Sequence, residues 1–153
     1  MNHQKVTIAP AGAARTHNGF GITTAANRIA FYSPDIELCA NLRLLFQDEY
    51  TLYTTTDPEM LLFIVNLLNP NIMIADAPFT DKMAQRFDDM KRGHPEMRIL
   101  LFNVSHGHAI AGGTFIPNSR KDLIDAVIYK PVDIAELKTR IQELLPKEKE
   151  PIQ

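Results

Sequence analysis

The sequence predicts an α/β domain in which a parallel sheet of five strands is covered by helices on both faces. Between residues 28 and 145, apolar segments typical of buried strands alternate with segments of helical periodicity. Four of the strand segments are continuously apolar, which is typical of parallel strands that are covered on both faces. Right-handed crossovers between such strands predict a doubly wound sheet.

The first predicted strand covers residues 29–32 and leads into a helix. Ser33 is the expected N-cap of that helix and Pro34 its first residue, with the acidic Asp35 in its first turn. β-Branched and aromatic residues predict the second strand at residues 50–56.

A second helix is predicted at residues 57–68, because it begins at an Asp-Pro pair and ends before an Asn-Pro pair. The third strand covers residues 72–76 and ends in a carboxylate, Asp76. The third helix follows, and its core side chains are expected to be Met83, Phe87 and Met90.

The fourth strand is predicted at residues 99–102. Residues 104–118 contain three glycines and a proline, so the fourth helix is expected to be short or irregular. The fifth strand ends at Lys130, and Asp133 opens the last helix in a capping box with Glu136.

These elements place one domain, at residues 28–145, between two tails. Residues 1–27 are rich in Ala, Gly, Thr and Asn. A strand at residues 5–9 finds no support nearby, so a mobile N-terminal tail is the better interpretation. Residues 146–153 form a charged C-terminal tail.

Composition excludes several classes of partner. The net charge of −2 gives no bulk attraction to nucleic acid or to an anionic membrane. No apolar segment approaches the ~20 residues of a membrane span, and no signal peptide is recognisable. Cys39 is the only cysteine, which excludes an intramolecular disulfide and fits a protein of the reducing cytoplasm.

The candidate site pairs Asp76 with Lys130. In a flavodoxin-like (βα)5 sheet of strand order 2-1-3-4-5, ligands collect at the carboxyl ends of the strands. The ends of the first, third and fifth strands lie near each other there, so Asp76 and Lys130 are expected to be neighbours. A plain ion pair between them is the simplest interpretation of their ground state.

Residues 28–145 resemble a response-regulator receiver domain of two-component signalling, the CheY-like superfamily. The resemblance rests on the (βα)5 rhythm, on Asp76 at the end of the third strand and on Lys130-Pro131 at the end of the fifth. It implies that Asp76 accepts a phosphoryl group from the phosphohistidine of a sensor histidine kinase or phosphotransfer protein. It also implies that Lys130 contacts that phosphoryl group and that the Lys130-Pro131 peptide is cis.

The sequence departs from the family at the positions that carry the chemistry. Tyr32 and Ser33 stand where the family has an acidic pair that holds Mg²⁺. Asp35 is the nearest acid, so the predicted metal ligands are Asp76 and Asp35. Asn103 stands where the family has a Thr or Ser whose hydroxyl follows the phosphoryl group in the conformational switch, so Asn103 is the expected second phosphoryl contact. Val127 stands where the family has the aromatic residue of that switch.

Four further residues have simpler interpretations. His106 and His108 are expected to be solvated loop residues, because a metal site needs a third ligand. His94 is expected at a helix C-terminus, and Cys39 as a small core residue.

The favoured hypothesis is a stand-alone, receiver-like signalling protein that is not an enzyme. It acts by contact with a kinase, a phosphotransfer protein or a downstream signalling protein, through the fourth strand, fifth strand and last helix. Partner binding carries the signal, with phosphorylation weak or absent. A homodimer is left open. About eight residues follow the last helix, too few for an output domain.

Two alternatives remain. A conventional response regulator would phosphorylate Asp76 and use Asp35 for the metal. A flavodoxin-like nucleotide or flavin binder would need backbone N–H groups to hold a phosphate, and the Ser33-Pro34 and Ala77-Pro78 turns offer few. The sequence has no nucleophile elbow, P-loop or Rossmann glycine motif that would indicate an enzyme.

Overall fold

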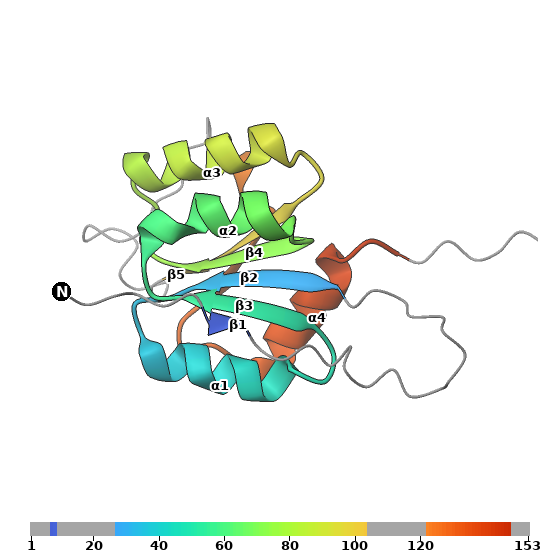
Figure 1. Ribbon diagram of the computed structural model, residues 1–153. Coiled ribbons are helices and arrows are strands. Elements are labelled where there is room, and N and C mark those ends of the chain that lie inside the picture. Colours follow the sequence, from blue (N-terminus) through green and yellow to red (C-terminus); the bar gives the residue numbers. More distant parts are fainter. Residues whose placement is uncertain (1–6, 9–26, 104–121, 148–153) are drawn as a thin grey trace, which may run out of the picture.

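A six-stranded sheet forms the centre of the protein (Figure 1). The computed structural model describes residues 7–8, 27–103 and 122–147. The strands, in their spatial order, are β1 (Thr7–Ile8), β3 (Thr51–Thr55), β2 (Arg28–Tyr32), β4 (Ile72–Asp76), β5 (Arg98–Asn103) and β6 (Ala126–Tyr129).

The five strands β2 to β6 run parallel and confirm the predicted order 2-1-3-4-5. The sixth strand corrects the prediction for the N-terminal segment. β1 lies within residues 5–9, where a strand had no local support, and pairs antiparallel with β3. Its partner is more than 40 residues away in the sequence, so local pattern could not reveal the pairing.

In the part of the chain that the structure describes, four α-helices cover the sheet (Figure 1). α1 (Ile36–Phe46) and α4 (Ile134–Leu144) lie on one face, and α2 (Leu61–Leu68) and α3 (Asp81–Gly93) lie on the other. A 3-10 turn (Pro58–Met60) precedes α2. The helix predicted between the fourth and fifth strands falls largely within residues 104–121, outside the described residues.

Each sheet face has its own apolar core, as expected for strands that are covered on both sides. Alternate residues of one strand serve the two cores: Phe31 packs on the α1/α4 face, while Ala30 packs on the α2/α3 face. The rings of Phe31 and Phe102 lie 5.7 Å apart. The predicted stripe of the third helix is confirmed as core, since Met83, Phe87 and Met90 are buried.

The start of α1 differs from the prediction. The N-cap is Asp35 rather than Ser33, and Pro34 precedes the helix. The Asp35 carboxylate accepts hydrogen bonds from the N–H groups of Glu37 and Leu38, at 3.0 and 3.2 Å. Ser and Asp are both good N-caps. The choice between them depends on the tertiary structure, because the Ser33 hydroxyl donates its hydrogen bond to Asp76 instead of capping the helix.

Asp125 holds α3 to the sheet and was missed in the sequence. Its carboxylate accepts hydrogen bonds from the Lys91 ammonium at 2.8 Å, from the Ile99 N–H at 2.8 Å and from the Arg98 guanidinium at 3.1 Å. The Asp125 side chain is only 13% exposed. Burial alone raises its pKa, but these donors outweigh burial, so the pKa of Asp125 lies below the ordinary value of 3.8.

Candidate functional site

Asp76 and Lys130 meet at the carboxyl end of the sheet, as the strand order predicts. Asp76 is the last residue of β4, and Lys130 directly follows β6. The Lys130 Nζ lies 2.5 Å from Asp76 Oδ1. The Asp76 side chain is 5% exposed and that of Lys130 is 43% exposed, so solvent contacts the lysine while the carboxylate is buried.

Ser33 occupies the second oxygen of the same carboxylate. Its hydroxyl donates a hydrogen bond of 2.6 Å to Asp76 Oδ2, and its own oxygen accepts one of 3.0 Å from the Asp35 N–H. Ser33 is fully buried and directly follows β2. Both carboxylate oxygens of Asp76 therefore have a partner within the protein.

The acidic side chains of Asp35 and Asp57 cap helix N-termini. Asp35 caps α1, and the Asp57 carboxylate accepts from the Glu59 N–H at 2.9 Å at the turn before α2. Within residues 27–103 and 122–147, no group of three or more His, Cys, Asp or Glu side chains is placed to hold a metal ion. This donor set is a poor match for Mg²⁺, which prefers several hard oxygen ligands around an octahedron.

Two neutral groups lie close enough to the Asp76 carboxylate to be affected by its charge. Burial, with the charge of Asp76 next, raises the pKa of Tyr32, so the phenol stays protonated at neutral pH. Burial raises the pKa of Cys39 to about 11, and its thiol donates weakly to the Ser33 carbonyl at 3.7 Å. Cys39 is thus a buried thiol in the core, as predicted, and not a reactive thiolate.

The structure describes some of the other predicted site residues and leaves the side chains of others undescribed. The Lys130-Pro131 peptide is cis, as the family resemblance implies. Asn103 ends β5 opposite Tyr129, but its side chain is outside the description, as are His106 and His108. Val127 lies partly buried against the α2/α3 core, whereas Tyr129 is 38% exposed.

The contact from Ser33 to Asp76 is the feature that sequence reasoning missed. Ser33 was interpreted as a helix cap because of the residues that follow it. The available signal was its position directly after the first strand, which faces the end of the third strand in this fold.

We expect two substitutions of Asp76 to distinguish how much its hydrogen bond with Ser33 and its ion pair with Lys130 each contribute to stability. Asp76→Ala should lower the free energy of unfolding by about 2 kcal/mol, because the buried Ser33 hydroxyl loses its acceptor. Asp76→Asn should cost about 1 kcal/mol or less, because the amide keeps an acceptor and Lys130 is half exposed. Urea denaturation measures both, and equal losses would contradict this division.

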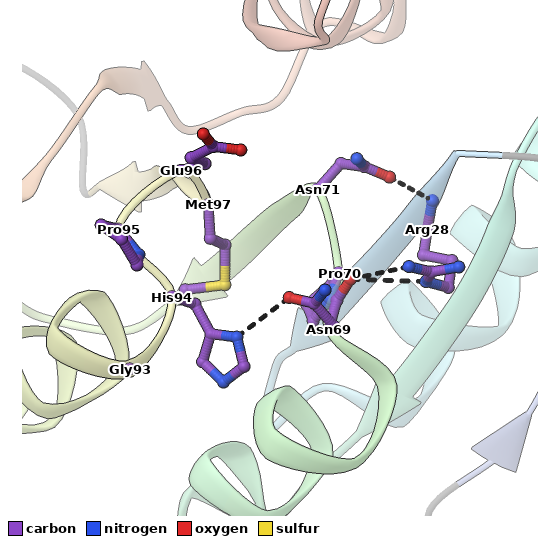
Figure 2. Close-up of a pocket in the computed structure, with 9 residues that line it drawn as sticks. All are labelled: Arg28, Asn69, Pro70, Asn71, Gly93, His94, Pro95, Glu96 and Met97. Atoms are coloured by element: carbon purple, nitrogen blue, oxygen red, sulfur yellow. Dashed lines mark hydrogen bonds between the residues drawn. The ribbon is translucent and has the colours of Figure 1, made fainter.

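A concave region lies at the end of the sheet opposite to Asp76 (Figure 2). The His94 ring contacts Asn69 Oδ1 at 2.9 Å, and Arg28 donates to the Asn69 carbonyl at 3.2 Å. Asn69 is the C-cap of α2, with a φ of 45° that asparagine tolerates well. His94 is the C-cap of α3, as predicted, so these contacts tie two helix ends together.

Comparison with known proteins gives a match at the level of fold. No family model and no curated protein matches the chain. Among solved structures, the receiver domain of a two-component response regulator from Bacteroides fragilis matches with a TM-score of 0.63 and 17% identity. That match covers 80% of this chain and 99% of the other.

Two further structures show the same likeness. Chemotaxis protein CheY4 of Vibrio cholerae matches with a TM-score of 0.62 and 15% identity, over 79% of this chain and 100% of the other. A putative pilus assembly-related protein of Burkholderia pseudomallei matches with a TM-score of 0.61 and 16% identity, over 80% and 92%. The protein therefore has the flavodoxin-like, CheY-like fold of response-regulator receiver domains.

Proposed function

We propose that this protein is a receiver-like signalling protein that acts by protein–protein contact, without Mg²⁺-dependent phosphorylation of Asp76. One observation carries the proposal: the buried Ser33 hydroxyl bonds Asp76 Oδ2 at 2.6 Å from a position where the family has an acid. In this proposal the Asp76–Lys130 ion pair has a structural role and joins the ends of β4 and β6.

The chemistry of phosphoryl transfer supports this. Transfer to a carboxylate develops charge on the equatorial oxygens, and a metal ion normally neutralises it. A neutral hydroxyl in place of a carboxylate weakens the attraction for a divalent cation. Lys130 is the cation that directly contacts Asp76, and it supplies one charge where Mg²⁺ supplies two.

The proposed partners are those of two-component signalling: a sensor histidine kinase, a phosphotransfer protein or a downstream signalling protein. β5, β6 and α4 form the proposed contact surface, and the exposed Tyr129 ends β6 there. The proposed location is the cytoplasm. Among the described helices, none has both the length and the hydropathy to cross a membrane.

The test uses the phosphoryl analogue BeF₃⁻. We expect that BeF₃⁻ or acetyl phosphate with Mg²⁺ leaves the backbone NMR shifts around Asp76 unchanged, because both oxygens of its carboxylate already have protein partners. Asp76→Asn, which removes the carboxylate, is the control for non-specific effects of the additives.

Shifts that require both Mg²⁺ and Asp76 would contradict the proposal and support a conventional phosphorylated receiver. In that case Asp35→Ala decides the alternative metal ligand. Loss of the shifts in this variant would assign the metal to Asp35, and their persistence would exclude that role.

A further inference from the structure

The concave region at the end of the sheet opposite to Asp76 has the size of a small-molecule site (Figure 2). Its volume is about 570 Å³, within the range of roughly 300–1,000 Å³ that is typical of ligand pockets. It lies where β2 and β4 begin and where α2 and α3 end. Pro70, Pro95 and Met97 form the apolar part of its lining, and polar side chains form most of the rest.

Arg28 gives this region a positive charge of fixed orientation. Its Nε and Nη2 atoms donate to the Asn69 carbonyl at 3.4 and 3.2 Å, which holds the plane of the guanidinium. Among the residues that the structure describes, no carboxylate forms an ion pair with Arg28. The Nη1 group makes no hydrogen bond there, so its two N–H donors are available to a ligand.

Asn71 adds a second donor on the same side of the region. Its Oδ1 atom accepts a hydrogen bond of 2.8 Å from the Arg28 N–H, so the orientation of its amide is determined. The Nδ2 group then keeps two N–H donors that have no partner in the described part of the chain. A guanidinium beside an amide suits a carboxylate, since both groups donate to its oxygens.

The other side of the region favours a positive charge. Figure 2 shows Glu96 and Arg28 on opposite sides of it. Within residues 27–103 and 122–147, the Glu96 carboxylate has no ion pair. α2 and α3 end here, at the caps Asn69 and His94, and the C-terminus of a helix carries a partial negative charge. These charges stabilise an ammonium group and oppose a doubly charged anion such as phosphate.

We propose that this region binds a small zwitterion. The ligand carboxylate contacts Arg28 and Asn71, and the ligand ammonium contacts Glu96. A short peptide with free termini has this chemistry, and the ends of an extended dipeptide are about 7 Å apart. Its side chains pack on the apolar part of the lining. Asp76 lies at the other end of the sheet, so binding here is independent of the proposed signalling mechanism.

Isothermal titration calorimetry on the full-length protein tests the proposal, with the dipeptide alanyl-leucine as the probe. We expect the free dipeptide to bind about tenfold more tightly than its C-terminal amide, because the amide loses charge-assisted bonds to the guanidinium. The N-acetylated dipeptide lacks the ammonium and should bind about threefold more weakly than the free form. This loss is smaller because Glu96 is exposed.

Two variants assign each end of the ligand. Glu96→Gln should weaken binding of the free dipeptide about threefold and leave binding of the N-acetylated form unchanged. Arg28→Gln should weaken binding of the free dipeptide about tenfold and change binding of the C-terminal amide little. Glu136→Gln, at an exposed acid in the first turn of α4, is the control and should leave binding unchanged. Circular dichroism checks that each variant is folded.

Three results would overturn the proposal. The first is the absence of saturable binding of the free dipeptide at millimolar concentration. The second is equal binding of the free and the blocked dipeptides, which would show that the two charges are not recognised. The third is a Glu96→Gln variant that binds the free dipeptide as well as the wild type does. Glu96 makes no ion pair within the described residues, so this variant remains informative even if Arg28→Gln fails to fold.

Discussion

Ser33→Asp is expected to make the stability of this protein depend on Mg²⁺. Without metal, the variant should lose about 2–4 kcal/mol of unfolding free energy, because it buries a second negative charge beside Asp76. The new carboxylate keeps the bond from the Asp35 N–H but loses the one that Ser33 donates to Asp76. Two facing carboxylates then form the start of a divalent-cation site.

Thermal and urea unfolding with and without Mg²⁺ measure the effect. At a concentration one hundred times the dissociation constant, bound Mg²⁺ returns about 2.7 kcal/mol. Ser33→Asn is the neutral control, since it adds similar bulk without charge. Ser33→Asp combined with Asp76→Asn tests whether both carboxylates are needed. If Mg²⁺ stabilises the wild type as much as Ser33→Asp, then the serine at position 33 is not what weakens Mg²⁺ binding at this site.

Asp125→Ala is expected to lower the free energy of unfolding by about 3 kcal/mol. The carboxylate is nearly buried and joins Lys91 on α3 to the Arg98–Ile99 segment of β5. Its removal leaves the Lys91 ammonium, itself 18% exposed, without its partner. Asp89→Ala, at an exposed position of α3 with one hydrogen bond to Gln85, is the control and should cost about 0.5 kcal/mol or less.

The contribution of Asp125 should also depend on pH. Its folded-state pKa lies below 3.8, so its ionised form is stabilised by folding and contributes fully above the unfolded value. As the pH falls through the folded pKa, the carboxylate is protonated and the contribution disappears. The stability difference between wild type and Asp125→Asn should therefore be constant above about pH 5 and shrink below pH 3.8. A constant difference down to pH 2 would show that the ionic bonds contribute little.

Local sequence patterns were sufficient for the five parallel strands, for their order and for the four described α-helices, but not for β1. Continuous apolar runs identified the strands, and the stripe of Met83, Phe87 and Met90 identified a helix face, because both patterns report burial within a few residues. The meeting of Asp76 and Lys130 followed from topology, since parallel strands in this order end at one rim.

The details that decide the chemistry were not local. Ser33 and Asp35 are both good helix caps, and the choice between them depends on a hydrogen bond from Ser33 to Asp76 on another strand. Asp125 looks like an ordinary polar residue until Lys91 and Arg98 are brought to it from other elements.

The sequence by itself determined the doubly wound architecture and the position of the Asp76–Lys130 pair, because hydrophobic periodicity and crossover handedness act through short segments and general rules. Only the tertiary structure decided what surrounds that pair and where β1 joins the sheet. Hydrogen bonds such as that from Ser33 to Asp76, and ladders such as β1 with β3, join residues more than 40 positions apart. Such contacts become visible once the chain has folded.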